Sequence, residues 1–200
     1  VSAQTQRKCA SIFHAIRKAL TGGVPGAGQT TMAAKNLRRL IVGCDHGGYD
    51  MKAQLLDYIK GKYSDLTIVD VGCNGPADRC DYPDIAQALA VHVIADSEAA
   101  PAEGDAPGLW TPGILVCGSG IGISIAANKV DGIRCALCHD HWTASMCRAH
   151  NDANVMALGG RCLGIEPAKG MVDAFFATPF EGDRHCGRIA KIHGLEAAKQ

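Results

Sequence analysis

The stretch that decides the fold runs from residue 113 to residue 129 and reads GILVCGSGIGISIAANK. Its first five residues, Gly113 to Cys117, form an apolar run that predicts a buried strand. Three glycines follow within the next five residues and predict a tight turn before a helix at 121–129. Such a turn presents backbone N–H groups beside the positive end of a helix, which is a site for anions. The same field favours thiolate over thiol, so Cys117 joins a candidate base to a cradle for negative charge.

The sequence around this stretch alternates between strand-like and helix-like segments. Short apolar segments predict five strands, at residues 37–44, 66–71, 114–117, 133–138 and 155–158. Apolar residues at helical spacing predict helices at 50–62, 83–94, 121–129, 142–150, 167–176 and from about 184 onward. This order predicts a flavodoxin-like or Rossmann-like α/β fold, a doubly wound five-stranded parallel sheet with helices on both faces and a C-terminal helix. Ligands of such sheets bind beyond the carboxyl ends of the strands.

The composition is that of a globular chain with an uneven charge distribution. The 200 residues are 47% hydrophobic, and 20 basic residues balance 20 acidic ones. Residues 1–44 hold seven basic residues and no acidic one, so the remainder has 13 basic and 20 acidic residues and a net charge of −7. An acidic body argues against a nucleic-acid-binding face. No apolar stretch approaches the ~20 residues that span a bilayer, so no membrane partner is expected.

Two segments depart from the alternating pattern. Residues 1–36 are basic and acid-free, and are expected to be a disordered extension or an organelle transit peptide. Residues 37–200 form the expected domain. Within it, residues 96–111 are acidic and rich in Ala, Pro and Gly, which predicts a surface insert without chemistry. The expected location is the cytoplasm, or an organelle if residues 1–35 are a transit peptide.

Ten cysteines raise the question of disulfides and of metal. Their spacing is unlike a small secreted framework, so free thiols in a reducing compartment are expected. The sharpest alternative is a zinc site formed by Cys135, Cys138, Cys147 and His150, which have ligand-like spacing. Cys135 and Cys138 lie three apart on one predicted strand, where side chains point to opposite faces, and this argues against zinc.

Nucleotide sites are also disfavoured by the glycine pattern. Residues 118–122 read G-x-G-x-G, whereas the dinucleotide fingerprint is G-x-G-x-x-G after the first strand of the fold. The turn follows the third predicted strand. No lysine of the P-loop type comes after the glycines.

Polar and basic residues follow the predicted strands. Asp45 and His46 come after the first strand, and Arg161 comes after the fifth. The segment 139–141 follows the fourth strand, and the next helix ends in the polar residues 148–152. The topology rule therefore predicts that all of these residues gather at one edge of the sheet.

Six separated motifs resemble ribose-5-phosphate isomerase type B, whose wider family includes the galactose-6-phosphate isomerase subunits. They are DHGG at 45–48, DYPD at 81–84, CGSGIG at 117–122, AANK at 126–129, HNDAN at 150–154 and GDRH at 182–185. The resemblance covers residues 37–195. The basic extension and the acidic insert are departures that touch no motif residue. The resemblance implies an aldose–ketose isomerase that works through a cis-enediolate, without metal or cofactor.

The resemblance also implies a role for each motif residue. Cys117 is the implied base, and Ser119 with the N–H groups around Gly118, Gly120 and Gly122 is the implied set of oxyanion donors. His150 is the implied ring-opening group, with Asn151 beside it. The remaining implied substrate contacts are Asp45 to sugar hydroxyls, Tyr82 in the pocket wall, and His46, Arg161, Arg184 and Arg188 to phosphate. Arginine suits phosphate because its planar fork donates two hydrogen bonds at once.

Simpler structural roles remain open for several of these residues. Ser119 could be a helix N-cap, Asp45 a turn residue, and each arginine a solvated surface charge. His150 could interact only with the end of its helix.

The expected reaction is the interconversion of ribose 5-phosphate and ribulose 5-phosphate in the non-oxidative pentose phosphate pathway. The alternatives are a hexose-phosphate isomerase, acting on galactose or allose 6-phosphate, and a non-catalytic sugar-phosphate-binding module. Because the family shares its pocket between two subunits, a homodimer or homotetramer is expected. Ile189, Ile192 and Leu195 would form an apolar stripe on the C-terminal helix, facing the partner or the chain's own core.

Overall fold

The computed structural model describes residues 37–99 and 110–197. The strands are β1 (Arg39–Cys44), β2 (Thr67–Asp70), β3 (Gly113–Cys117), β4 (Cys135–Leu137) and β5 (Val155–Gly159). The helices are α2 (Tyr49–Lys62), α3 (Tyr82–Glu98), α4 (Ile121–Ala127), α5 (His141–Asn151), α6 (Ile165–Ala177) and α7 (Arg184–Ala197). None of these helices is long and apolar enough to cross a bilayer. The expected N-terminal extension and most of the expected acidic insert lie outside the described residues.

The five strands form one parallel sheet in the order β2-β1-β3-β5-β4. This confirms the predicted doubly wound α/β fold. The order differs from the flavodoxin order 2-1-3-4-5 in its last two positions, because β5 lies inside the sheet and β4 at its edge. The chain reverses its winding direction between β1 and β3, so the crevice beyond the carboxyl ends of these two strands is where a ligand is expected.

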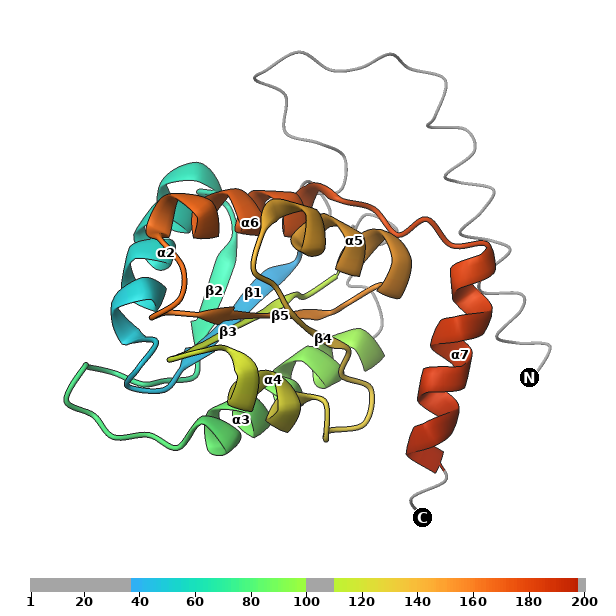
Figure 1. The fold of residues 1–200 in the computed structure, drawn as a ribbon, viewed down its shortest axis with the longest axis horizontal. Helices are drawn as coiled ribbons and strands as arrows, with labels where there is room; N and C mark the ends of the chain where they lie inside the picture. Colours follow the sequence, from blue (N-terminus) through green and yellow to red (C-terminus); the bar gives the residue numbers. More distant parts are fainter. Residues whose placement is uncertain (1–36, 100–109, 198–200) are drawn as a thin grey trace, which may run out of the picture.

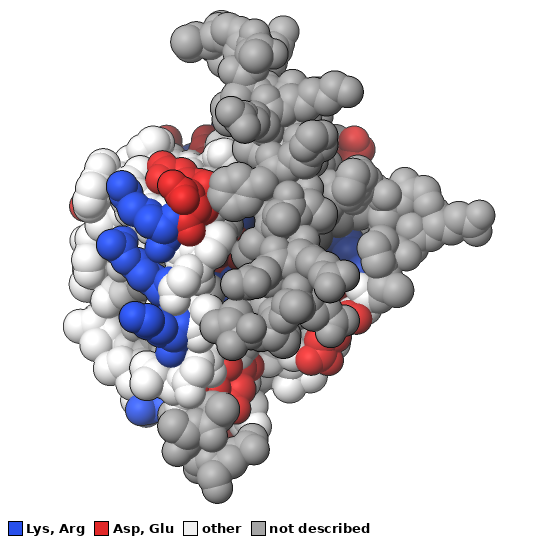
Figure 2. All heavy atoms as spheres, turned by 90° about the vertical axis from the view of Figure 1, so that its right-hand side faces the viewer, with Lys and Arg blue, Asp and Glu red and all other residues white. Residues whose placement is uncertain are grey.

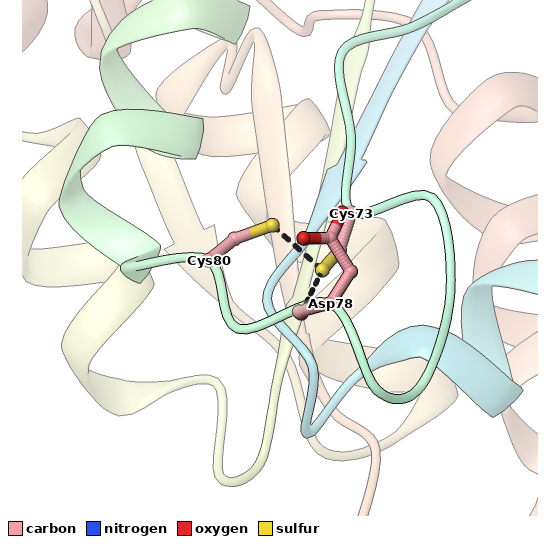
Figure 3. Close-up of side chains that lie close together, drawn as sticks. All are labelled: Cys73, Asp78 and Cys80. Atoms are coloured by element: carbon pink, nitrogen blue, oxygen red, sulfur yellow. Dashed lines mark hydrogen bonds between the residues drawn. The ribbon is translucent and has the colours of Figure 1, made fainter.

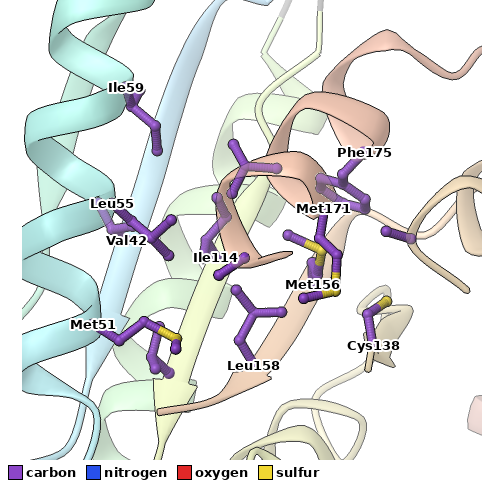
Figure 4. Packing of buried hydrophobic residues seen from close by; sticks show 14 of the residues in the cluster. Val42, Met51, Leu55, Ile59, Ile114, Cys138, Met156, Leu158, Met171 and Phe175 are labelled. Carbon is purple, nitrogen blue, oxygen red and sulfur yellow. The ribbon is translucent and has the colours of Figure 1, made fainter. Parts of the chain in front are cut away.

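Two layers of helices cover the sheet, with α2, α5 and α6 on one face and α3 and α4 on the other (Figure 1). Successive strand residues point to opposite layers: Val42 packs in the first, Ile41 in the second. Figure 4 shows the first layer, where α2 and α6 side chains enclose the sheet residues. Its labelled members include Met51, Leu55, Ile59, Ile114, Met156, Leu158, Met171 and Phe175. Burying each such side chain contributes about 1.5–3 kcal/mol.

Helix α7 stands apart from both layers, beside the amino ends of the strands (Figure 1). Polar contacts fasten it: the Gly132 N–H donates to Glu196 Oε1 at 3.0 Å, and Arg134 lies 3.1 Å from His193 Nε2. Of the predicted apolar stripe, Ile189 is half-buried, whereas Ile192 and Leu195 are 41% and 67% exposed. The chain's own core therefore does not cover this stripe.

Two elements differ from their predicted bounds for identifiable reasons. The fourth strand starts at Cys135, not at residue 133, because the Arg134 N–H donates to the side chain of Asn154 instead of a strand. Helix α3 continues to Glu98, three residues into the expected insert. Within it, Asp96 pairs with Arg39 and accepts a hydrogen bond from Thr111 Oγ1 at 2.8 Å.

Candidate active site

A cavity of about 590 Å³ opens at the switch point of the sheet. It is bounded by the loops after β1, β3 and β5 and by the start of α3. Eight of the predicted site residues line it, namely Asp45, His46, Tyr82, Cys117, Gly118, Ser119, Gly122 and Arg161. The position after each strand therefore correctly predicted that these residues lie together.

The sulfur of Cys117 lies at the inner end of the cavity. Cys117 is the last residue of β3 and is only 4% exposed. Its Sγ accepts a hydrogen bond from the Gly120 N–H at 3.1 Å. Gly120 has a φ of +78°, and a Cβ there would lie 2.6 Å from Leu137 Cδ1 and 2.9 Å from the Leu158 carbonyl carbon. Only glycine fits this place, so the donor to the sulfur is held by the backbone.

Ser119 stands between the sulfur and helix α4. Its Oγ accepts a hydrogen bond from the Ile121 N–H at 3.3 Å, but the N-cap of α4 is Gly120. The loop after β5 holds the turn in place, since the Gly160 and Arg161 N–H groups donate to the carbonyls of Cys117 and Gly118 at 2.8 and 2.9 Å. The Ser119 hydroxyl can therefore serve a ligand while it also orders the helix start.

Asp45 is both a turn residue and a wall of the cavity. Its Oδ1 accepts hydrogen bonds from the N–H groups of Gly47 at 2.8 Å and Gly48 at 3.1 Å. Its backbone N–H donates to the Val116 carbonyl at 3.1 Å, which ties this loop to β3. The carboxylate is 8% exposed and has a fixed orientation toward the cavity it lines.

A histidine, an arginine and an aromatic ring complete the cavity. His46 and Arg161 are exposed, and Arg161 lies against two loops: a Cβ on Gly47 would be 3.3 Å from its Nη2, and one on Gly118 3.6 Å from its Cζ. Tyr82, at the start of α3, covers Gly122, where a Cβ would lie 2.9 Å from the ring. The two glycines beside Arg161 and the one beneath Tyr82 therefore let these side chains approach the backbone.

The other predicted residues belong to a second group, on α5 and α7. The rings of His150 and His185 stack with centroids 4.4 Å apart and planes 10° apart. Glu181 Oε2 lies 3.6 Å from His150 Nε2 and 3.7 Å from His185 Nε2. Burial lowers the pKa of His185, and the charges of His150, Arg184 and Arg188 lower it further, against the opposing effect of Glu181. We call His150, Glu181, His185, Arg184 and Arg188 the histidine–arginine cluster.

The histidine–arginine cluster lies near the amino ends of the strands, whereas the cavity lies at their carboxyl ends. The Gly113 N–H, at the start of β3, donates to the carbonyl of Asn154 at 2.8 Å, so the segment after α5 adjoins the amino ends of the strands. From Gly113 to Cys117 a strand rises about 13 Å. The prediction that residues 148–152 gather with Cys117 is therefore wrong for a single chain. His150, Asn151, Arg184 and Arg188 do not line the cavity of their own chain.

The face that carries α7 displays a column of basic side chains (Figure 2). Arg184, Arg188 and Lys191 are exposed and follow one another at positions i, i+4 and i+7 of the helix. This spacing places three cations on one side of α7, where they are available to an anionic group from outside the chain.

Two features of this second group were not assigned from the sequence. His185, which is buried in the structure, stands in the GDRH motif, and its place in that motif could have marked it as a candidate. Nothing in the sequence around Glu181 marked that residue. The zinc alternative is wrong as formulated, because His150 lies with Glu181 and His185 rather than with the cysteines. The Cys138 thiol donates to the Cys147 sulfur, with the two Sγ atoms 4.0 Å apart.

The fold and the cavity define a class of protein. A buried thiol with a backbone donor, an oriented carboxylate, a histidine and an arginine suit proton transfer on a small anionic substrate at the switch point of an α/β sheet. The sequence from residue 40 to residue 192 matches the Ribose/Galactose Isomerase family, and the chain belongs to this family.

Three relatives show how close the similarity is. Ribose-5-phosphate isomerase B of Escherichia coli (strain K12) is 38% identical over 160 residues, which are 80% of this chain and 97% of that protein. D-erythrulose-4-phosphate isomerase of Pectobacterium atrosepticum is 39% identical over 153 residues, 76% of this chain and 91% of that protein. The solved structure of Clostridium thermocellum ribose-5-phosphate isomerase B has a TM-score of 0.70 and 38% identity, covering 81% of this chain and 99% of that one. The chain is a sugar-phosphate isomerase, and the non-catalytic alternative is excluded.

Proposed function

We propose that this enzyme interconverts ribose 5-phosphate and ribulose 5-phosphate through a cis-enediolate, in the non-oxidative pentose phosphate pathway of the cytoplasm. The names of the Escherichia coli and Clostridium thermocellum relatives support this substrate. The observation that carries the proposal is the sulfur of Cys117, buried at the cavity with an N–H donor 3.1 Å away. A base for a C–H proton needs a fixed position beside the substrate, and the hydrogen bond to the Cys117 sulfur supports this role.

The proton balance of the reaction needs only this chain's own groups. The Cys117 thiolate removes the proton from C2 of the open-chain aldose, and the electron pair moves to form the C1–C2 double bond of the enediolate. Ser119 and the N–H groups of the glycine turn stabilise the oxyanion, each such donor contributing about 3–4 kcal/mol to the transition state. The Cys117 thiol then returns the proton to C1, and the proton of the C2 hydroxyl passes to the C1 oxygen, which gives the ketose with no net gain or loss of protons.

The substrate also needs its furanose ring opened and its phosphate bound. The cavity supplies Asp45 for sugar hydroxyls and His46 and Arg161 for phosphate, but His150, the residue implied to open the ring, does not line it. We propose that a second copy of the chain brings its His150, with Asn151, to the cavity, and that Arg184 and Arg188 of that copy join the phosphate site.

Exposed apolar side chains beside the cavity support this assembly. Ile121 and Ile125 of α4 are 53% and 56% exposed, close to Tyr82, which is 40% exposed. Ile192 and Leu195 of α7 are uncovered as well. Exposed apolar groups at both regions are typical of surfaces buried on association, and a two-fold dimer uses each region twice. A homodimer, or a pair of dimers, is the assembly we propose.

A hexose 6-phosphate, of galactose or allose, is the second candidate substrate. The family is described by both ribose and galactose isomerases, and the Pectobacterium relative is named for a four-carbon sugar phosphate. The cavity of about 590 Å³ has room for a hexose. Each candidate uses the same proton transfer, so substrate choice is a matter of chain length between the carbonyl and the phosphate.

The test is the formation of ribulose 5-phosphate from ribose 5-phosphate by the full chain in the presence of EDTA. We expect turnover to survive EDTA, to fall about 10³-fold or more in Cys117→Ala, and to persist in Cys162→Ala, a matched change of an exposed cysteine at the rim of the same cavity. Galactose and allose 6-phosphate are assayed in parallel. Faster turnover of a hexose phosphate would transfer the proposal to that substrate, and loss of activity in EDTA would contradict the metal-free mechanism.

A further inference from the structure

A second pair of thiols lies outside the cavity, in the loop between β2 and α3. Cys73 is fully buried and Cys80 is half-buried, and their sulfurs face each other beside Asp78 (Figure 3). The Cys80 thiol donates to Cys73 with the two Sγ atoms 2.6 Å apart. This separation exceeds the ~2.05 Å disulfide bond by only about half an ångström. The proton transfer proposed above uses neither sulfur.

The backbone brings both cysteines to this place. The Cys73 N–H donates to the Cys44 carbonyl at 2.8 Å, and Lys52 Nζ donates to the Cys73 carbonyl at 2.9 Å, which extends the pairing beside β1. The loop then folds back, because the N–H groups of Asp78 and Cys80 donate to carbonyls within the loop at 3.1 Å. These backbone contacts hold the two cysteines in place with their sulfurs facing each other.

A metal ion fits this group less well. Ligand atoms of Cys73, Asp78 and Cys80 lie within 4.8 Å of one another. Two thiolates on a tetrahedral zinc ion, with Zn–S bonds of ~2.3 Å, sit roughly 3.8 Å apart. The observed 2.6 Å is too short for two ligands of one ion, and Asp78 is exposed to solvent. The geometry favours a covalent bond between the sulfurs.

We propose that Cys73 and Cys80 form a reversible disulfide when the enzyme meets a small disulfide oxidant such as glutathione disulfide. A thiolate at the half-buried Cys80 attacks one sulfur of the oxidant, breaks its S–S bond and releases one glutathione thiolate. The Cys73 thiolate then attacks the Cys80 sulfur of the mixed disulfide and releases the second glutathione thiolate. The two protein thiols lose two electrons and two protons, and the oxidant becomes two molecules of glutathione.

The reaction depends on pH because its attacking group is a thiolate. The hydrogen bond to Cys73 raises the pKa of Cys80 to about 12, with burial and the neighbouring Asp78 acting in the same direction. Because the thiolate is the nucleophile, the exchange rate is expected to increase as the pH rises from 7 to 9. The bond closes a ring from residue 73 to residue 80, two residues before Tyr82 of the cavity wall, so oxidation fixes the loop that leads to that wall.

The experiment equilibrates the full chain with glutathione disulfide, blocks free thiols by alkylation and digests with trypsin. Trypsin cleaves after Lys62, Arg79 and Lys129, so Cys73 and Cys80 fall on separate peptides, 63–79 and 80–129. A second cleavage after Glu98 separates Cys80 from Cys117. We expect the linked pair 63–79 and 80–98, two mass units lighter than the two thiol peptides together, and its loss on treatment with dithiothreitol.

Two variants keep the result interpretable. Cys80→Ser removes the more exposed sulfur and is expected to lower the linked species at least tenfold while the chain stays folded, whereas Cys162→Ser leaves it unchanged. Alkylation of both Cys73 and Cys80 after equilibration, or linkage of Cys73 to another cysteine, would overturn the proposal. So would one zinc ion per chain that protects both thiols and is lost in Cys80→Ser.

Discussion

The cavity and the histidine–arginine cluster lie at opposite edges of one sheet and are built in different ways. At the cavity, main-chain groups hold the functional atoms: a glycine N–H contacts Cys117, and two further N–H groups hold Asp45. In the cluster, side chains hold one another through the stacked rings of His150 and His185. The cavity holds the proposed base, Cys117, whereas the cluster holds the proposed ring-opening residue, His150. The proposed mechanism needs both regions.

This complementarity is what a shared site requires. In a two-fold dimer the same two surfaces meet twice, so one chain's cavity can face the other chain's cluster in two equivalent places. In this arrangement the cavity of one chain positions the proposed base, and α5 and α7 of the other chain supply the proposed ring-opening histidine. The following predictions test this division between the two edges.

The largest effect is expected when two inactive variants are mixed. Cys117→Ala disables the cavity, and His150→Ala disables the cluster with an expected loss of about 10²-fold or more. In a mixed dimer one of the two sites has both residues intact. After dissociation and random reassociation, activity should return to about a quarter of that of the unmutated enzyme.

The measurement is the initial rate of isomerisation before and after co-refolding, with each variant refolded alone as the control. If both residues acted within one chain, mixing would give only the average of the two parents. No recovery above that average would contradict the division between the edges.

The next prediction compares how a glycine-to-alanine change in each region alters the free energy of unfolding. Gly120→Ala should destabilise the fold by about 2–4 kcal/mol, because φ is +78° and the new Cβ meets Leu137 and the main chain at Leu158. Gly187→Ala in α7 meets nothing within 4 Å and should instead stabilise the helix by about 0.5–1 kcal/mol. Urea unfolding measures both, and similar free energies of unfolding for the two variants would refute the contrast.

The cavity was predictable from the sequence because its residues follow buried strands directly. Asp45 follows β1, Cys117 ends β3 and Arg161 follows β5, so apolar runs placed all three at the carboxyl edge of the sheet. The single parallel sheet followed from the same alternation. The exchange of β4 and β5 in the strand order did not, since both are short and no sequence signal distinguishes an edge place from an inner one.

The position of His150 could not be read by the same rule. Helix α5 begins after β4 at the cavity edge, but its 11 residues rise about 16 Å and end at the opposite edge. The prediction was wrong because it placed the last residues of α5 at the same end of the sheet as its first residues. The late start of β4 has a different cause, since side chains of Asn128 and Asn154 bind the backbone at residues 134 and 135. Such side-chain bonds leave no periodic signal.

A smaller effect on KM is expected when one arginine of each region is replaced by lysine. Arg161→Lys and Arg184→Lys keep the charge but lose the planar fork that grips a phosphate, so each should raise KM about tenfold with little change in kcat. Arg79→Lys, at an exposed loop position, is the matched control. Steady-state kinetics with ribose 5-phosphate measure KM and kcat for each variant. An unchanged KM in Arg184→Lys would contradict a role of the cluster in phosphate binding.

The smallest effect is the pH dependence of stability caused by His185. Its pKa is lowered in the folded chain by burial and by His150, Arg184 and Arg188, and raised only by Glu181. Above pH 6.5 the ring is neutral in both states and has no effect. As the pH falls below 6.5 the unfolded chain binds the proton first, so the free energy of unfolding decreases. His185→Gln should lose this decrease, as measured by urea midpoints at pH 7.5 and 5.5, while His139→Gln at an exposed position should retain it. An equal decrease in both variants would show that the stacked pair of histidines does not disfavour protonation, and the cluster would then be as free to take up a proton as an exposed histidine.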